Sequence, residues 1–154
     1  MIEKDTVRLL RECDAGIKMG LKAIDEVMNY AESEELKRSL DQCRDKHERL
    51  KKEIRELLDK YQDEGKEPGA VAKSMSWMKT EVKLAVNQSD GTIADLITDG
   101  CNMGIKSLSR YLNQFKAADE ESKDITKRLI KQEEELAVSM RGCLLYTSPS
   151  PRDR

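Results

Sequence analysis

His47, the only histidine in the chain, is the residue whose type and surroundings most clearly suggest chemistry. It falls within a repeating apolar pattern between Cys43 and Leu50, which predicts that its ring faces the centre of a helical bundle. Glu133 holds the matching position in the second half of the chain, and we expect Asp14 to lie nearby. An imidazole with carboxylates is a workable partial ligand set for a single iron or manganese ion.

Two other interpretations of His47 remain open. The ring could hydrogen-bond to a carboxylate and fix the register of neighbouring helices, a role that buried polar groups have in some proteins. It could also face solvent, if the helix that carries it is rotated. Neither interpretation requires a cofactor.

The rest of the sequence offers no catalytic pattern. It contains no nucleophile–base pair, no glycine-rich phosphate loop and no cysteine pair at metal-binding spacing. The cysteines within the helical patterns are typical of reduced core thiols: Cys13, Cys43 and Cys101. We therefore expect a protein that is not an enzyme.

Apolar residues three or four positions apart predict the helices that carry these side chains. The long helical patterns cover residues 6–30, 33–61, 92–115 and 125–140. Ser33 is the expected N-cap of the second helix, and Thr92 or Asp90 that of the third. A shorter helix is expected within residues 71–86. The predicted fold class is all-α, an antiparallel four-helix bundle with an extra short helix in the long crossover between the second and third main helices.

A six-residue phrase occurs twice, as Cys13-Asp-Ala-Gly-Ile-Lys18 and as Cys101-Asn-Met-Gly-Ile-Lys106. Each copy lies on the first helix of a helix pair, which predicts two related pairs. The copies are offset by 88 residues, whereas the second and fourth helices match at an offset of 86. Glycines spaced by four accompany both copies: Gly16, Gly20, Gly100 and Gly104. A glycine inside a helix costs about 1 kcal/mol relative to alanine, so we expect these four to permit close helix packing, unless some face solvent.

Composition narrows the class of protein. The chain is 38% apolar and 38% charged, with one Phe and one Trp, which is typical of helices with charged outer faces. A net charge of −2 gives no basis for binding nucleic acid or an anionic membrane. No apolar run approaches the roughly 18 residues of a membrane span, and the charged N-terminus lacks a signal-peptide core. We expect a cytoplasmic protein.

Residues 143–154 differ from the rest of the chain. Their sequence resembles the in-frame translation of a transposase-type sequencing adapter, and Thr147-Ser-Pro-Ser-Pro151 should end a helix. We therefore expect one domain over residues 1–142, followed by a non-native, disordered tail over residues 143–154.

Three short motifs, Cys13-Asp-Ala-Gly16, Met78-Lys79 and Asp99-Gly-Cys-Asn102, are similar to those of a bacterial family of small ferritin-like proteins of unknown function. The resemblance covers most of residues 6–141 and implies a ferritin-like bundle. Ferritin-like relatives that bind two irons use a glutamate from each of two helices and a Glu-x-x-His motif from each of the other two.

This chain departs from the di-iron pattern. Arg44 stands three residues before its single histidine, and Ile17 and Cys101 align with the carboxylate positions of the family. We therefore expect a non-enzymatic structural or interaction protein, with a second copy or another protein as partner. The alternative is a ferritin-like protein with a reduced iron or manganese site around His47 and Glu133. A third hypothesis is a partner-binding strip at Met75 to Met78.

Overall fold

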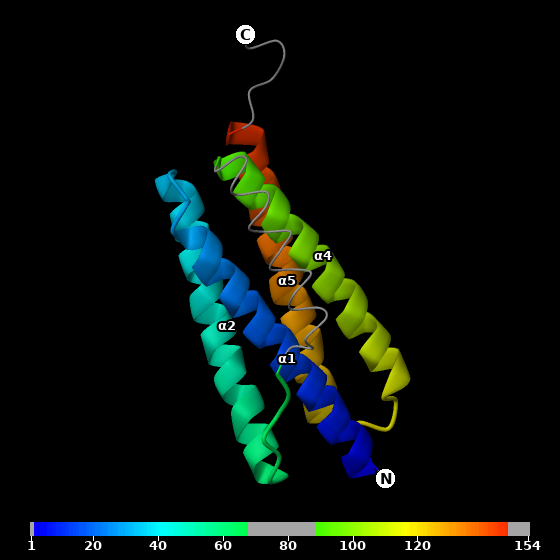
Figure 1. Ribbon diagram of the computed structural model, residues 1–154. Coiled ribbons are helices and arrows are strands. Elements are labelled where there is room, and N and C mark those ends of the chain that lie inside the picture. Colours follow the sequence, from blue (N-terminus) through cyan, green and yellow to red (C-terminus); the bar gives the residue numbers. More distant parts are fainter. Residues whose placement is uncertain (1, 68–88, 148–154) are drawn as a thin grey trace.

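The computed structural model describes residues 2–67 and 89–147, with side chains described in residues 4–67 and 89–142. Over these ranges the chain forms four helices and no strand, as Figure 1 shows. The helices are α1 (Ile2–Met28), α2 (Glu34–Lys60), α4 (Asp90–Gln114) and α5 (Glu120–Thr147). The all-α prediction is confirmed. The expected short helix at 71–86, and with it the strip at Met75 to Met78, lies outside the described residues.

The helices form two antiparallel hairpins, α1–α2 and α4–α5, joined by one long connection (Figure 1). Hydrogen bonds at both ends of the bundle hold the hairpins together. The carboxylate of Asp90 accepts from the backbone N–H groups of Glu32 at 2.8 Å and Ser33 at 2.9 Å. At the opposite end, the backbone N–H of Asp119 donates to Thr6 Oγ1 at 2.8 Å. Helices α1 and α4 are therefore antiparallel, and α1 runs parallel to α5.

Side-chain caps determine where two of the helices begin. Ser33 caps α2, as predicted, because its hydroxyl oxygen accepts from the backbone N–H of Leu36. The predicted cap of α4 was wrong. Ser89 holds that position and accepts from the N–H of Thr92. Asp90 was a plausible cap by residue type, but its carboxylate is used by the α1–α2 turn, a contact between distant segments that local sequence cannot reveal.

The buried faces of the two hairpins correspond closely. On α2 and α5, buried positions match at the predicted offset of 86: Leu36 and Ser122, Leu40 and Thr126, Cys43 and Leu129, Leu50 and Leu136, Ile54 and Met140. On α1 and α4 they match at an offset of 84: Leu9 and Ile93, Leu10 and Ala94, Cys13 and Ile97, Ile17 and Cys101, Ile24 and Leu108. The repeated phrase had suggested 88. The offsets of 84 and 88 differ by about one helical turn, so both match residues on the same face of the helix. The identical residues of the repeated phrase therefore indicated the correct face but paired α1 with α4 one turn out of register.

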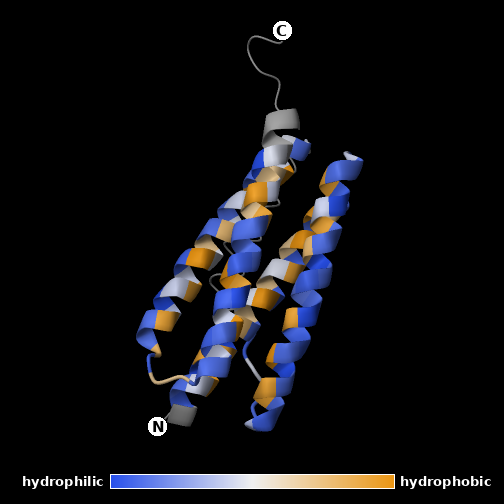
Figure 2. Ribbon diagram, turned by 180° about the vertical axis from the view of Figure 1, so that it is seen from behind, coloured by the Kyte–Doolittle hydropathy of each residue, from blue (hydrophilic) through white to orange (hydrophobic). Residues whose placement is uncertain are grey.

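Figure 2 shows that hydrophobic and hydrophilic residues alternate along the helices. The buried hydrophobic residues of both hairpins form shared core clusters. Within the described residues no helix is long and apolar enough to cross a membrane. At the C-terminal end, the backbone of residues 143–147 continues α5, whereas we expected a disordered tail from residue 143. Leucine sustains a helix, so the helix extends toward the first proline of the Ser-Pro-Ser-Pro stretch. Residues 148–154 lie outside the described part.

Replacing Asp90 with alanine should destabilise the bundle by about 1–2 kcal/mol, because two backbone N–H groups lose a charged acceptor. Urea unfolding followed by circular dichroism measures the change. The matched control is Asp45→Ala, which removes an exposed acid from α2 and should change stability by less than about 0.5 kcal/mol. Equal effects of the two substitutions would contradict the role assigned to Asp90.

Candidate functional site: a polar layer inside the bundle

A polar layer separates two apolar core clusters of the bundle. One cluster contains Ile24, Leu40, Cys43, Ile97, Cys101, Leu136 and Met140, among others. The other contains Leu10, Ile17, Leu50, Ile54, Leu108, Ile125 and Leu129, among others. Each helix contributes one residue to the level between them: Gly20, His47, Gly104 and Glu133. We call these four residues the central layer.

The His47 ring lies across the gap between the hairpins. It is fully buried, and its Nε2 lies 3.0 Å from Glu133 Oε1 on α5. Its Nδ1 lies 3.1 Å from the backbone carbonyl oxygen of Cys43 and 3.4 Å from the Cys43 sulfur. Both ring nitrogens therefore have partners within the protein.

The partners of His47 determine where its protons are. The carbonyl of Cys43 can only accept, so Nδ1 carries a proton and donates it. Nε2 faces a carboxylate, and an ionised Glu133 likewise accepts. Burial alone lowers the pKa of His47, but the bonds to Cys43 and Glu133 outweigh it and raise the pKa to about 10. The layer thus holds an imidazolium–carboxylate pair at neutral pH.

Cys101 on α4 lies near this pair. Burial, together with the negative charge of the Glu133 carboxylate, raises the pKa of its thiol. Cys13, Cys43 and Cys101 are all buried and free of disulfides, as predicted for core thiols. A thiol with a raised pKa is a poor nucleophile at neutral pH, so this arrangement suits a hydrogen-bond donor better than a reactive cysteine.

Two of the four predicted packing glycines border the ion pair. A Cβ atom on Gly20 would lie 3.3 Å from both Cδ2 and Nε2 of His47, which is closer than most side chains pack. A Cβ on Gly104 would lie 3.6 Å from Glu133 Oε2, an ordinary contact. Among the described residues, no neighbouring side chain or distant backbone lies within 4 Å of a Cβ built on Gly16 or Gly100, and both glycines are exposed. The packing prediction therefore holds for Gly20 and Gly104, and the solvent-facing alternative holds for the other pair.

Asp14 does not join the central layer. Its buried carboxylate accepts from the backbone N–H of Lys66 at 2.9 Å and pairs with Lys18 Nζ at 2.8 Å. It also lies directly against Gly65, whose φ of +88° favours glycine. Asp14 therefore holds the start of the long connection against α1. Sequence reasoning missed this role because nothing in the pattern showed that residues 63–67 return along α1.

Of the three predicted metal ligands, the structure brings together His47 and Glu133 but not Asp14. Within residues 4–67 and 89–142, no group of three or more His, Cys, Asp or Glu side chains is arranged to hold a metal ion. Cys101 lies close enough to Glu133 for the carboxylate charge to raise its pKa, whereas the sequence indicated only a core thiol and a replaced carboxylate. Cys101 stands three residues before Gly104, so it lies on the same face of α4 about one turn away, and this spacing could have indicated that it lies near the layer.

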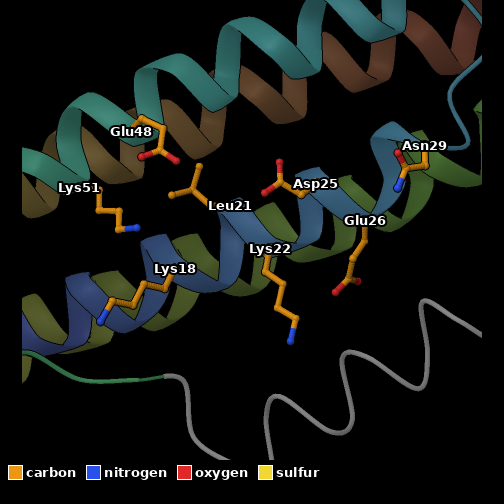
Figure 3. Close-up of a pocket in the computed structure, with 8 residues that line it drawn as sticks. All are labelled: Lys18, Leu21, Lys22, Asp25, Glu26, Asn29, Glu48 and Lys51. Carbon is orange, nitrogen blue, oxygen red and sulfur yellow. The ribbon is translucent and has the colours of Figure 1, made fainter.

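A groove of about 520 Å³ lies on the surface between α1 and α2 (Figure 3). It is lined by Lys18, Leu21, Lys22, Asp25, Glu26, Asn29, Glu48 and Lys51. Its lining mixes three lysines with three acids, and it includes none of the central-layer residues. The groove therefore gives no access to the ion pair.

The four glycines should respond differently to substitution by alanine. Gly16→Ala and Gly100→Ala should stabilise the protein by about 0.5–1 kcal/mol, because alanine favours the helix and meets no neighbouring atom. In Gly20→Ala the same gain should be offset or reversed, because His47 must move. Urea unfolding of the single variants tests this order. Equal stabilisation by Gly20→Ala and Gly16→Ala would contradict the close packing at His47.

Stability should also fall at alkaline pH through His47. Its pKa is about 6.5 in an unfolded chain and about 10 in the folded protein, so the folded state holds the proton more tightly. This contribution is complete below pH 6.5 and is lost as the pH rises toward 10. The measurement is the free energy of unfolding of wild type minus that of His47→Gln between pH 6 and pH 10. A difference that stays constant over this range would refute the assignment.

Comparisons with known proteins add no identification. No known protein family, no curated protein and no solved structure matches the chain. The residues of the central layer therefore carry the functional inference.

Proposed function

We propose that this chain is a non-enzymatic, ferritin-like structural or interaction protein whose central layer fixes the packing of the bundle instead of holding two irons. The topology supports the first part. Two antiparallel hairpins joined by one long connection is the arrangement of ferritin-like bundles. The interaction role, with a second copy or another protein as partner, belongs to the same proposal.

The residues at the centre of the bundle support the absence of a di-iron site. Di-iron bundles direct a carboxylate inward from every helix and a histidine from two of them. Here α1 and α4 contribute Gly20 and Gly104 at the level of the ion pair. Ile17, at an expected carboxylate position, is buried in the apolar cluster below the layer. One histidine and one glutamate are too few to hold two metal ions.

One observation carries the structural role: both ring nitrogens of His47 are bonded within the protein. Nδ1 donates to the Cys43 carbonyl, and Nε2 donates to Glu133. A buried ion pair is tolerated only when such bonds replace the lost water, and removing one partner typically costs about 3–5 kcal/mol. The pair therefore holds α2 and α5 at one relative height.

The second candidate is a reduced iron or manganese site at His47 and Glu133. A metal-bound histidine usually donates its other ring N–H to a carbonyl or carboxylate, which orients the ring. The bond from Nδ1 to the Cys43 carbonyl provides this orientation, with Nε2 directed at Glu133. A metal there would replace the proton on Nε2 and bind between the imidazole and the carboxylate.

Metal analysis of untagged protein separates the two candidates. We expect far less than one iron or manganese per chain after expression in metal-supplemented medium, in wild type and in His47→Ala alike. His47→Ala should also lower stability by about 3 kcal/mol or more, which urea unfolding measures. Stoichiometric metal in wild type that is lost in His47→Ala would overturn the structural proposal in favour of the metal site. Asp14→Ala is the matched control, because it removes a buried carboxylate outside the layer.

A further inference from the structure

The two hairpins bury nearly interchangeable faces. The buried positions of α1 recur on α4 at an offset of 84, and those of α2 recur on α5 at an offset of 86. Most matched positions are apolar in both hairpins, and the exceptions on α5 are Ser122 and Thr126, which match Leu36 and Leu40. Where both members of a matched pair are apolar, their packing does not by itself select one hairpin over the other, because apolar contact is not directional.

The central layer breaks this equivalence. His47 and Glu133 occupy matching positions at the offset of 86, but one side chain is a donor and the other an acceptor. Gly20 and Gly104 lie beside them on the other helix of each hairpin. The layer thus makes the two hairpins complementary, whereas the apolar clusters on either side leave them alike.

The consequence concerns how two copies of the chain could pair. If two copies paired through like hairpins, the two His47 rings would meet in one core and the two Glu133 carboxylates in the other. The rings would face each other with N–H donors, and the carboxylates with acceptors alone. Buried groups of like charge without partners are strongly unfavourable. Most apolar positions on either side would still match in such a dimer, so the layer is where like pairing brings like charges together in the core.

We propose that the unlike pair of His47 and Glu133 selects the packing of the α1–α2 hairpin on the α4–α5 hairpin and excludes a like-with-like dimer of two copies. The proposal rests on the structural role proposed for the layer and specifies what that role regulates. It belongs to a known class of device, in which one buried polar position selects among assemblies that apolar packing leaves close in energy.

The test compares full-length variants that change the layer while keeping its place in the core. In His47→Leu/Glu133→Leu both hairpins become apolar at this level, so like pairing is no longer penalised. We expect its self-association constant to be at least tenfold higher than that of wild type, which corresponds to about 1.4 kcal/mol in the free energy of association. Analytical ultracentrifugation measures both constants. Lysine cross-linking of mixed isotopically light and heavy copies should show new α2–α2 links between copies.

Two controls separate complementarity from general disturbance of the core. The reversed pair, His47→Glu/Glu133→His, restores one donor and one acceptor and should associate as wild type does. Leu50→Met/Leu136→Met changes two matched apolar positions next to the layer and should also leave association unchanged.

The outcomes are distinct. Two results would overturn the proposal: association of the leucine variant at the wild-type level, or association of the reversed pair as strong as that of the leucine variant. If the leucine variant loses its helical circular dichroism, His47→Gln/Glu133→Gln decides by the same criteria, because two glutamines can bond to each other. Stoichiometric metal in the wild-type protein would instead count against the proposed function, whatever the association result.

Discussion

The ion pair between His47 and Glu133 is the interaction on which the rest of the bundle depends. It connects the two hairpins at the level where one apolar cluster ends and the next begins. Moving two charges out of water is costly, and the cost is offset only where other hydrogen bonds complete the pair. On the histidine side, the Cys43 carbonyl accepts from Nδ1 and provides such a bond. Sliding α2 by one turn against α5 would break the bond between His47 and Glu133.

The ion pair explains why two helix-interior positions beside it are glycines. The His47 ring lies so close to Gly20 that a Cβ there would come within 3.3 Å of it, and the Glu133 carboxylate lies beside Gly104. A helix-interior glycine is unfavourable relative to alanine, and here that loss makes room for the bonded pair. Gly16 and Gly100 have the same spacing but face open space, so the motif of two glycines four apart has two structural meanings within one chain.

The ends of the bundle are held by polar side chains that act at a distance in sequence. Asp90 accepts from the α1–α2 turn at one end, and Thr6 accepts from the backbone N–H of Asp119 at the other. Asp14 holds the segment that follows α2 against α1. Each accepts from backbone N–H groups that would otherwise lack a partner. Together with the central layer, these contacts give direction to a packing that apolar burial alone leaves ambiguous.

The sequence by itself determined the helices, their amphipathic faces and the buried position of His47, because helical periodicity is a local property of the chain. It also indicated Glu133 as the counterpart of His47, since the offset of 86 is visible in the apolar pattern. The offset of the other two helices, the position of Cys101 near Glu133 and the separation of Asp14 from the layer were decided only by tertiary structure. Each depends on which turn of one helix meets which turn of another, and residues one turn apart share a face, so periodicity cannot distinguish them.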